Sequence, residues 1–241
     1  GVDTEVPMHI ESVRGVKYVA ISRVENGVST EIFREEIVGE NKNFDYKPTV
    51  QLTEETSQLK VSVSDGREGK EVIGTVKTYV NMEVVQLKVG SHILANAEPF
   101  AVISLNDMKT YSVDEAIASE ESAKNVDIKF FINSKDGVLS FRFYSMENVD
   151  QKNSLYKGSG GKTLSNLPIK NMTKYVLFPA NFDYDTASRS SIENEYLTGN
   201  ADQKVYMTIE NFVGSVIGFK TGGSSSAGGE RYGVMKVLDV S

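Results

Sequence analysis

The sequence predicts a mainly β protein with two domains: a β-sandwich at residues 1–88 and a β-rich α+β domain at residues 89–241. Three observations support this prediction. The length of 241 residues corresponds to between one and two domains of ordinary size. Through the first third of the chain, short apolar runs recur about every 8–12 residues without helical periodicity. Beyond residue 88, similar runs are interrupted by a few short segments with helix-capping signals.

The first domain opens with a predicted hairpin. Val16–Val24 and Val28–Ile37 are rich in β-branched and aromatic residues, and Asn26-Gly27 lies between them. Asn-Gly is the strongest short hairpin signal because both residues tolerate a positive φ. We therefore expect these two runs to pair as antiparallel strands.

Further extended segments complete the predicted sandwich. Residues 44–52 form one of them, and Pro48 indicates an edge or a bulge there. Residues 59–63 alternate apolar with polar side chains, as expected of a half-buried strand. Asp-Gly at 65–66 predicts a turn, after which residues 72–80 return as a strand. Residues 81–90 lead to the second domain, with a further strand possible at 84–87.

The second domain is predicted to contain two helices. Ser112 and Glu115 have the spacing of a capping box, in which the hydroxyl and the carboxylate satisfy each other's backbone N–H groups. This spacing predicts a helix over Val113–Lys124. Ala187–Leu197 is the second helix candidate.

The remaining apolar runs of the second domain are predicted strands. Val126–Ile132 and Val138–Tyr144 flank a turn that ends in Asp136-Gly137, so we expect them to pair, with Ile128 and Phe130 on one buried face. The other predicted strands are residues 100–105, 175–178, 205–209, 213–220 and 232–240.

The segment Thr221–Arg231 contains four glycines, three serines and no large apolar residue. Nothing in this composition offsets the ordering cost of about 1–2 kcal/mol per residue. We therefore predict that the segment is mobile, and that deleting Gly223–Gly228 leaves the fold intact.

Composition excludes several classes of function. Lys plus Arg is 26 against 33 for Asp plus Glu, so the net charge is −7, and the basic residues do not cluster as in a nucleic-acid-binding surface. Two isolated histidines, His9 and His92, and no cysteine exclude a His- or Cys-rich metal site and a thiol nucleophile. Because the chain has only two histidines, its composition also argues against Ser-His catalysis. No apolar run reaches the roughly 18 residues of a membrane span. We expect no cofactor, no nucleic-acid partner and no span.

Two local motifs suggest sites. Gly161-Lys162-Thr163 ends like a phosphate-binding loop, but the motif requires a glycine where Tyr156 stands, so a surface loop is favoured. Asp183 and Asp185 could place two carboxylates on one face of an extended segment, as hard-cation sites do. They are weak metal candidates, because no ligand-spaced third carboxylate or turn glycine follows them.

Tyrosines are the candidates for ligand binding. The chain has 11 tyrosines and no tryptophan, and sugar rings stack on exposed aromatic faces. Those near predicted turns or helix ends are Tyr144, Tyr156, Tyr184 and Tyr196.

Several segments resemble domains of Bacteroidetes cell-envelope lipoproteins of unknown function. Residues 213–221 and 232–237 look like the hairpin that ends those domains, and residues 110–116 and 126–131 are similar to a segment upstream of it. Residues 44–46, 59–66 and 74–80 resemble the Ig-like domain that often precedes it. The chain departs from the pattern at Thr221–Arg231, which is longer than the family's tight turn.

The resemblance implies an Ig-like β-sandwich followed by a β-rich domain, held at the outer-membrane surface by a lipid anchor upstream of Gly1. With the composition, it favours a non-enzymatic binding or scaffolding module whose ligand is a glycan or an outer-membrane partner protein. The alternative is a glycan-active hydrolase that uses dispersed carboxylates. Such an enzyme needs two carboxyl groups facing each other across a cleft at about 5–9 Å.

Overall fold

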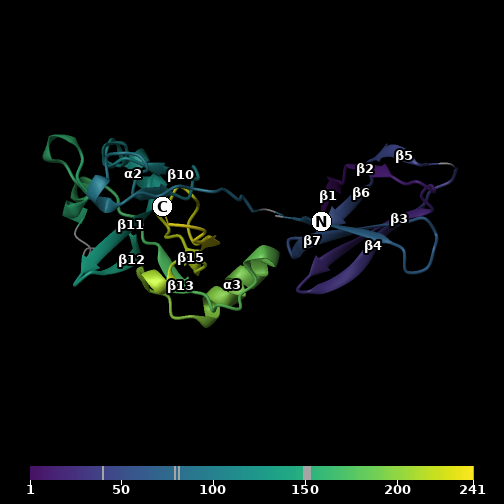
Figure 1. Ribbon diagram of the computed structural model, residues 1–241. Coiled ribbons are helices and arrows are strands. Elements are labelled where there is room, and N and C mark those ends of the chain that lie inside the picture. Colours follow the sequence, from purple (N-terminus) through teal and green to yellow (C-terminus); the bar gives the residue numbers. More distant parts are fainter. Residues whose placement is uncertain (40, 79, 81, 149–152, 241) are drawn as a thin grey trace. The chain divides into compact units, whose positions relative to one another are not determined.

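The protein is mainly β, with antiparallel sheets and few helices, as the sequence predicts (Figure 1). The computed structural model describes residues 1–39, 41–78, 80, 82–148 and 153–240. The chain divides into two compact units, the first comprising Gly1–Val84 and Asp183–Ser191, the second comprising Val85–Phe182 and Ile192–Ser241. The chain thus leaves the first unit near residue 84 and returns to it for one short segment.

Paired strands build the first unit. They are β1 (Val2–Glu5), β2 (Met8–Glu11), β3 (Tyr18–Glu25), β4 (Val28–Glu36), β5 (Asn43–Tyr46), β6 (Thr49–Leu52), β7 (Thr56–Ser64) and β8 (Val72–Lys77). One antiparallel sheet has the order β4-β3-β7-β8. β1 pairs with β6 and β2 with β5, which makes a two-part ribbon interrupted at Pro7 and Pro48. At this break the Val6 N–H donates to the Pro48 carbonyl over 2.9 Å.

The ribbon packs on one face of the four-stranded sheet and gives the unit a sandwich-like core. Ile21 and Leu59 of the sheet contact Val50 and Leu52 of β6 in one buried cluster. A second cluster joins Val19 to Ile10 and other residues of the β2/β5 pair. The alternation of apolar and polar residues along β3 and β7 produces this one-sided burial.

The predicted β3–β4 hairpin is confirmed. Asn26 and Gly27 have φ values of 49° and 79°, and Glu25 lies opposite Val28. β1 and β2 lie upstream of the first predicted strand, because their short runs carry too little apolar periodicity to signal it. Residues 82–90 contain no strand, so the possible strand at 84–87 is not formed.

The second unit combines two sheets with short helices. Its helices are α1 (Val113–Ala116), α2 (Glu120–Asn125) and most of α3 (Arg189–Thr198), and its strands are β9 (Val102–Ser104), β10 (Lys109–Tyr111), β11 (Val126–Lys135), β12 (Val138–Ser145), β13 (Lys174–Leu177), β14 (Lys204–Thr208), β15 (Val216–Lys220) and β16 (Tyr232–Lys236). The sheet orders are β10-β9-β11-β12-β14 and β13-β15-β16.

The second unit is built in three layers around the larger sheet. On one face, Phe130 and Phe141 meet Phe219 of the smaller sheet, and the Phe212 ring stacks on Phe141 at 4.0 Å between centroids. On the other face, a second cluster buries side chains of α1, α2 and the 3₁₀ turn at 164–166, together with Tyr156. Both faces of the central strands are therefore buried.

The predicted hairpin of the second unit is also confirmed. β11 pairs with β12 from Ile128–Ser145 to Lys135–Val138. Ile128 and Phe130 lie on the same buried face, as the period of two requires, and Ile132 packs against the same cluster.

The capping box forms, but the helix it begins is shorter than predicted. Ser112 and Glu115 satisfy each other's backbone N–H groups at the start of α1. Ser119 then adopts an extended conformation and accepts from the Ser122 N–H, which begins α2. A second N-cap residue thus divides the predicted Val113–Lys124 helix in two.

Candidate functional site

An open hollow of about 370 Å³ lies where the turn after β2 meets the β7–β8 turn. The apolar residues that line it, which we call its apolar floor, include Val63, Val72 and Val16, the last of which is 2% exposed. Arg14, Arg67 and Lys70 line it as well, and we call it the basic hollow. Its volume lies within the range of about 300–1,000 Å³ that is usual for ligand sites.

The turn after β2 is held by backbone contacts that place Arg14 beside the hollow. The Ser12 hydroxyl donates to the Gly15 carbonyl over 3.1 Å, which closes the turn around Arg14. The Val16 N–H donates to the Asn41 carbonyl at 3.0 Å, and the Lys17 N–H to the Ser64 carbonyl at 2.7 Å. Arg14 itself is exposed, so its guanidinium is accessible on an ordered backbone.

The β7–β8 turn positions Arg67. Gly66 has a φ of +86°, a conformation that other residues rarely adopt. Asp65 then accepts from the Arg67 backbone N–H at 3.2 Å and from its Nε at 2.8 Å. The Arg67 side chain holds the pKa of the Asp65 carboxyl below its usual value. Because the Asp65 side chain is 13% exposed and that of Arg67 is 52% exposed, the guanidinium still faces solvent.

The acidic groups of the hollow are already engaged. Asp65 is paired with Arg67, and Glu11 lies 3.4 Å from His9 Nε2. His9 Nδ1 is also 2.8 Å from Asp45, and hydrogen bonds to Asp45 and then Glu11 raise the pKa of His9. Arg14 and Lys70 thus add positive charge beside acids that have partners. Guanidinium and ammonium groups over an apolar floor suit a ligand that carries carboxylates or other anionic groups.

The structure does not bring the four candidate tyrosines together as an exposed platform. Tyr144 and Tyr156 are 1% and 0% exposed and belong to one core cluster of the second unit. Tyr196 is 5% exposed and its ring packs edge-on against Tyr232 at 5.2 Å. Only Tyr184 is partly exposed, in a 3₁₀ turn at 184–186. Three of the four rings therefore serve the core, where no ligand can stack on them in this conformation.

The two aspartates proposed for a cation do not point at a common centre. Asp183 caps the turn at 184–186, accepting from the backbone N–H groups of Asp185 and Thr186. Asp185 instead lies 2.8 Å from Lys77 Nζ. Among the residues that the structure describes, no group of three or more His, Cys, Asp or Glu side chains could hold a metal.

A buried carboxyl group lies in the second unit. Asp127 of β11 is 0% exposed, and burial raises its pKa to about 6. Its Oδ2 accepts from the Leu105 N–H at 2.9 Å, and its Oδ1 from Asn171 Nδ2 at 3.2 Å. Ser225 is a further hydrogen-bond partner. Asp127 therefore joins segments of the unit and does not open to a cleft.

The glycine- and serine-rich segment covers this carboxyl group. Thr221, Ser225 and Ala227 are 3%, 7% and 8% exposed. The Ser226 N–H donates to the Lys124 carbonyl at 2.9 Å, and the Ser224 hydroxyl to Asn171 Oδ1 at 2.8 Å. The expectation of a segment without holding contacts is wrong, because buried polar partners elsewhere in the unit supply the hydrogen bonds that its composition cannot reveal.

Lys129 is a second buried ionisable group in the same strand. Its side chain is 0% exposed, and its Nζ donates to the Asn148 carbonyl at 3.0 Å and to Asn153 Oδ1. Burial, and to a lesser extent the charge of Lys170, lower its pKa to about 7. Both acceptors belong to the segment after β12, so Lys129 anchors that segment to the sheet.

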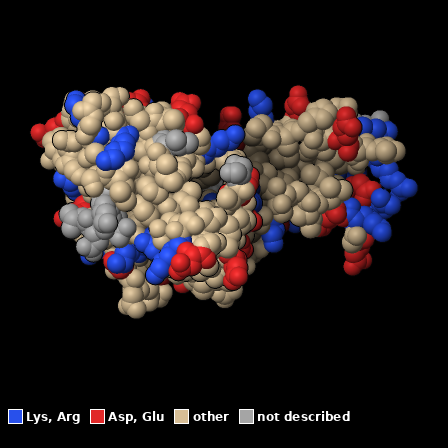
Figure 2. All heavy atoms as spheres, turned by 60° about the vertical axis from the view of Figure 1, so that its left-hand side comes forward, with Lys and Arg blue, Asp and Glu red and all other residues tan. Residues whose placement is uncertain are grey.

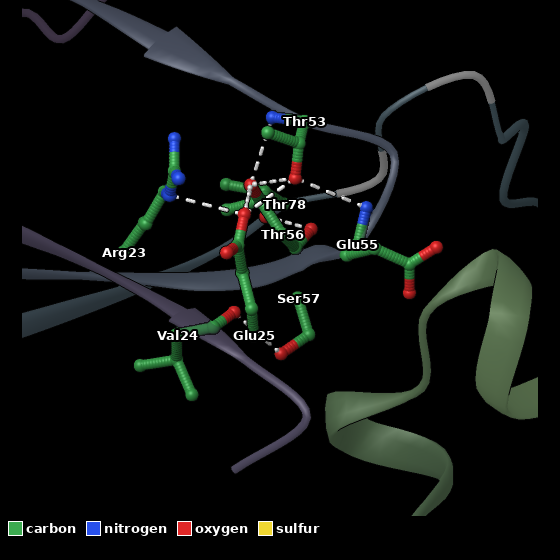
Figure 3. Close-up of polar contacts among 8 residues, drawn as sticks. All are labelled: Arg23, Val24, Glu25, Thr53, Glu55, Thr56, Ser57 and Thr78. Atoms are coloured by element: carbon green, nitrogen blue, oxygen red, sulfur yellow. Dashed lines mark hydrogen bonds and ion pairs between the residues drawn. The ribbon is translucent and has the colours of Figure 1, made fainter. Parts of the chain in front are cut away.

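A hydroxyl network fixes the turn between β6 and β7 in the first unit (Figure 3). Glu25 Oε1 lies 3.0 Å from Arg23 Nε and accepts from the hydroxyls of Thr53 and Thr56. The Thr56 hydroxyl in turn accepts from the Thr53 N–H at 3.0 Å. Thr78 Oγ1 donates to the Thr56 carbonyl at 2.7 Å. Since Thr56 is 0% exposed, this network is structural.

Basic and acidic side chains are interspersed over the visible surface, with broad areas between them that carry neither (Figure 2). None of the described helices is both long and apolar enough to cross a membrane. No protein-family model matches the chain, and comparisons with curated proteins and with solved structures found no match either.

Sequence reasoning missed the basic hollow, although it identified the turn at 65–66. Arg14, Arg67 and Lys70 lie in two segments that are far apart in the chain. Each is an ordinary exposed cation beside a glycine turn, so only the pairing of β3 with β7 reveals that they meet.

Proposed function

We propose that this protein is a non-enzymatic binding module of a bacterial cell envelope, and that the basic hollow of its first unit binds an acidic glycan. The carrying observation is the juxtaposition of Arg14, Arg67 and Lys70 beside an apolar floor in an otherwise acidic chain. Uronate-type carboxylates fit the guanidinium fork, while the apolar face of a sugar ring fits Val63 and Val72, which line the hollow and are accessible.

The hollow suits reversible binding of a surface polymer. It is open, so a polysaccharide can lie across it without threading. Its cations project from turns that backbone hydrogen bonds hold in place, which reduces the entropy lost on binding. The resemblance of several segments to lipoprotein domains of Bacteroidetes supports the cell envelope as the location, with an N-terminal lipid anchor.

Binding of uronate-containing oligosaccharides to the purified chain tests the proposal. Arg14→Ala combined with Lys70→Ala is expected to weaken binding at least tenfold by isothermal titration calorimetry. Arg34→Ala combined with Lys42→Ala removes the same charge from exposed positions outside the hollow and should leave affinity unchanged. Equal affinities for both variants, or preference for neutral over acidic oligosaccharides, would refute this assignment.

The same samples distinguish a non-enzymatic binding module from the alternative, a glycan-active hydrolase. Release of reducing ends from the bound oligosaccharide would show catalysis and overturn the non-enzymatic assignment. Asp127 is the observation closest to that alternative, since its pKa is raised as in a general acid. Its complete burial argues against that role, and Asp127→Asn is the variant that would abolish such release if it occurred.

A further inference from the structure

The two edges of the four-stranded sheet in the first unit differ in how they are protected. β4, at one edge, carries Glu31, Arg34, Glu35 and Glu36, and its pairing with β3 is interrupted by an irregularity. Charges and bulges of this kind prevent edge-to-edge association. β8, at the other edge, is Val-Ile-Gly-Thr-Val-Lys and has one charge, at its end. Only β4 therefore has the charged side chains and the irregular pairing that usually keep an edge strand from pairing with another chain.

β8 exposes apolar side chains on both of its faces. Val72, Ile73 and Val76 are 72%, 60% and 51% exposed. Val72 and Val76 lie opposite Val63 and Leu59 of β7, and thus on the core face of the sheet, beyond the cover that the ribbon provides. A further strand beside β8 would bury part of the exposed apolar surface of Val72 and Val76.

The backbone of β8 is oriented to accept such a strand. The Thr78 N–H donates to the Ser57 carbonyl at 3.1 Å, which marks 57–78 as a hydrogen-bonded pair. Antiparallel pairs alternate between hydrogen-bonded and non-hydrogen-bonded, so Val76 and Gly74 point their N–H and C=O groups at β7. By the same alternation, Ile73 and Thr75 point their N–H and C=O groups away from β7, toward the open edge of the sheet.

We propose that two copies of this chain associate through β8, forming a continuous antiparallel sheet across a two-fold axis at Gly74. In this register Ile73 faces Thr75 of the second copy, and both are residues with outward backbone groups, so they form hydrogen-bonded pairs. Val72 then lies opposite Val76 on the core face. Gly74 meets its own equivalent on the axis, where the lack of a side chain removes any clash.

The charges agree with the same register. Glu71 of one copy lies opposite Lys77 of the other, once on each side of the axis, and opposite charges across a strand pair are favourable. Lys77 also lies 2.8 Å from Asp185, and the Tyr18 hydroxyl donates to Glu71. The apolar pairs and the backbone hydrogen bonds therefore carry the association, and the charges select its register.

Sedimentation equilibrium of the full chain tests the association. We expect the weight-average mass to rise with concentration from that of a monomer toward that of a dimer. Thr75→Pro removes an outward N–H while keeping the pairing with β7, since proline is tolerated on the open side of an edge strand. This variant should weaken dimerisation at least tenfold, whereas Thr30→Val on β4 should leave it unchanged. Circular dichroism confirms that both variants fold.

Disulfide formation tests the register, because the chain has no cysteine of its own. Gly74→Cys places two thiols at a non-hydrogen-bonded pair, whose Cα atoms are about 4.5 Å apart and within disulfide reach. A Cβ at Gly74 meets no atom within 4 Å, so the variant is compatible with the fold. Oxidation should crosslink Gly74→Cys at least tenfold faster than Thr30→Cys at the protected edge.

The outcomes separate this inference from its competitors and from the proposed function. A mass that stays monomeric at millimolar concentration, or equal crosslinking at positions 74 and 30, overturns the β8 dimer. Dimerisation that Thr75→Pro does not weaken places the interface elsewhere and also overturns it. Gly74, Thr75 and Thr30 lie outside the basic hollow. Val72 lines the hollow and also lies in the proposed interface, so glycan binding is measured on Thr75→Pro at a concentration where that variant is a monomer, and its loss or retention there does not depend on association.

Discussion

At the scale of single residues, the two buried ionisable groups of β11 are the features that sequence reasoning could not find. Asp127 and Lys129 alternate with Ile128 and Phe130 in an ordinary strand pattern, in which polar side chains are expected to face water. The helical layer and the segment 221–231 cover that face instead. Their perturbed pKa values follow from this burial.

Lys129 makes the stability of the protein depend on pH. Its pKa is about 7 in the folded chain and above 10 in the unfolded chain, so the unfolded state binds more protons between these values. Stability should therefore rise with pH across this window, by up to about 1.4 kcal/mol per pH unit. In Lys129→Met this contribution to the slope should disappear.

Urea unfolding at intervals between pH 6.5 and 9.5 measures this slope. Lys135→Met, at an exposed position of the same strand, is the matched control and should retain the wild-type slope. A slope for Lys129→Met that equals the wild-type slope would contradict a neutral buried lysine.

The Thr56 hydroxyl is a second residue with a specific role. Thr56→Val keeps the shape of the side chain but leaves the partly buried Thr53 N–H without its acceptor and removes a donor to Glu25. We expect a loss of about 1–3 kcal/mol in the free energy of unfolding. Thr30→Val, at an exposed position of β4, should change it by less than about 0.5 kcal/mol. Chemical denaturation compares the two; equal effects would show that the network is not stabilising.

At the scale of elements, strands and hairpins followed from the sequence more closely than helices and loops. Period-two alternation and the Asn-Gly and Asp-Gly turns act between near neighbours, so both predicted hairpins formed, the second with its predicted buried face. The helix predicted over Val113–Lys124 divides because Ser119 competes with the helical backbone as an N-cap. α3 begins at Arg189 rather than at the predicted Ala187.

The segment Thr221–Arg231 gives the clearest prediction at this scale. Deleting Gly223–Gly228 removes the buried Ser225 and Ala227 and the contact from Ser226 to Lys124. It also removes Ser225, a hydrogen-bond partner of the buried Asp127 carboxyl group. We now expect the deletion to cost more than about 2 kcal/mol, since several buried polar groups lose their partners together.

Denaturation midpoints of the wild type and the deletion decide between the two expectations. Two glycines inserted between Asp136 and Gly137, in an exposed turn, provide the control and should cost little, because closure entropy grows slowly with loop length. Unchanged stability after the deletion would instead support the prediction from composition, that the deletion leaves the fold intact.

At the scale of the whole molecule, each unit has hydrophobic clusters of its own. Ile21 is 0% exposed in a cluster of the first unit, and Phe141 is 2% exposed in a cluster of the second. We expect Ile21→Ala and Phe141→Ala each to cost about 2–5 kcal/mol, with the loss confined to the unit that contains the substitution.

Hydrogen exchange read by mass spectrometry locates these effects. Ile21→Ala should accelerate exchange in β3, β4 and β7 but not in β11 and β12, and Phe141→Ala should do the reverse. Faster exchange in both units for either variant would show that they unfold as one cooperative system.

By itself, the sequence determined the β-rich class, the turns and the buried faces of the main strands, because alternation and turn chemistry operate over a few residues. Only the tertiary structure decided which groups meet across the chain. Arg14 and Arg67 line the same hollow, the segment 221–231 covers Asp127, and three of the candidate tyrosines are buried in the core. These outcomes depend on strand order and on the layers packed against each sheet. Residue spacing does not encode them, since the energy of burying a side chain is set by its partners in space.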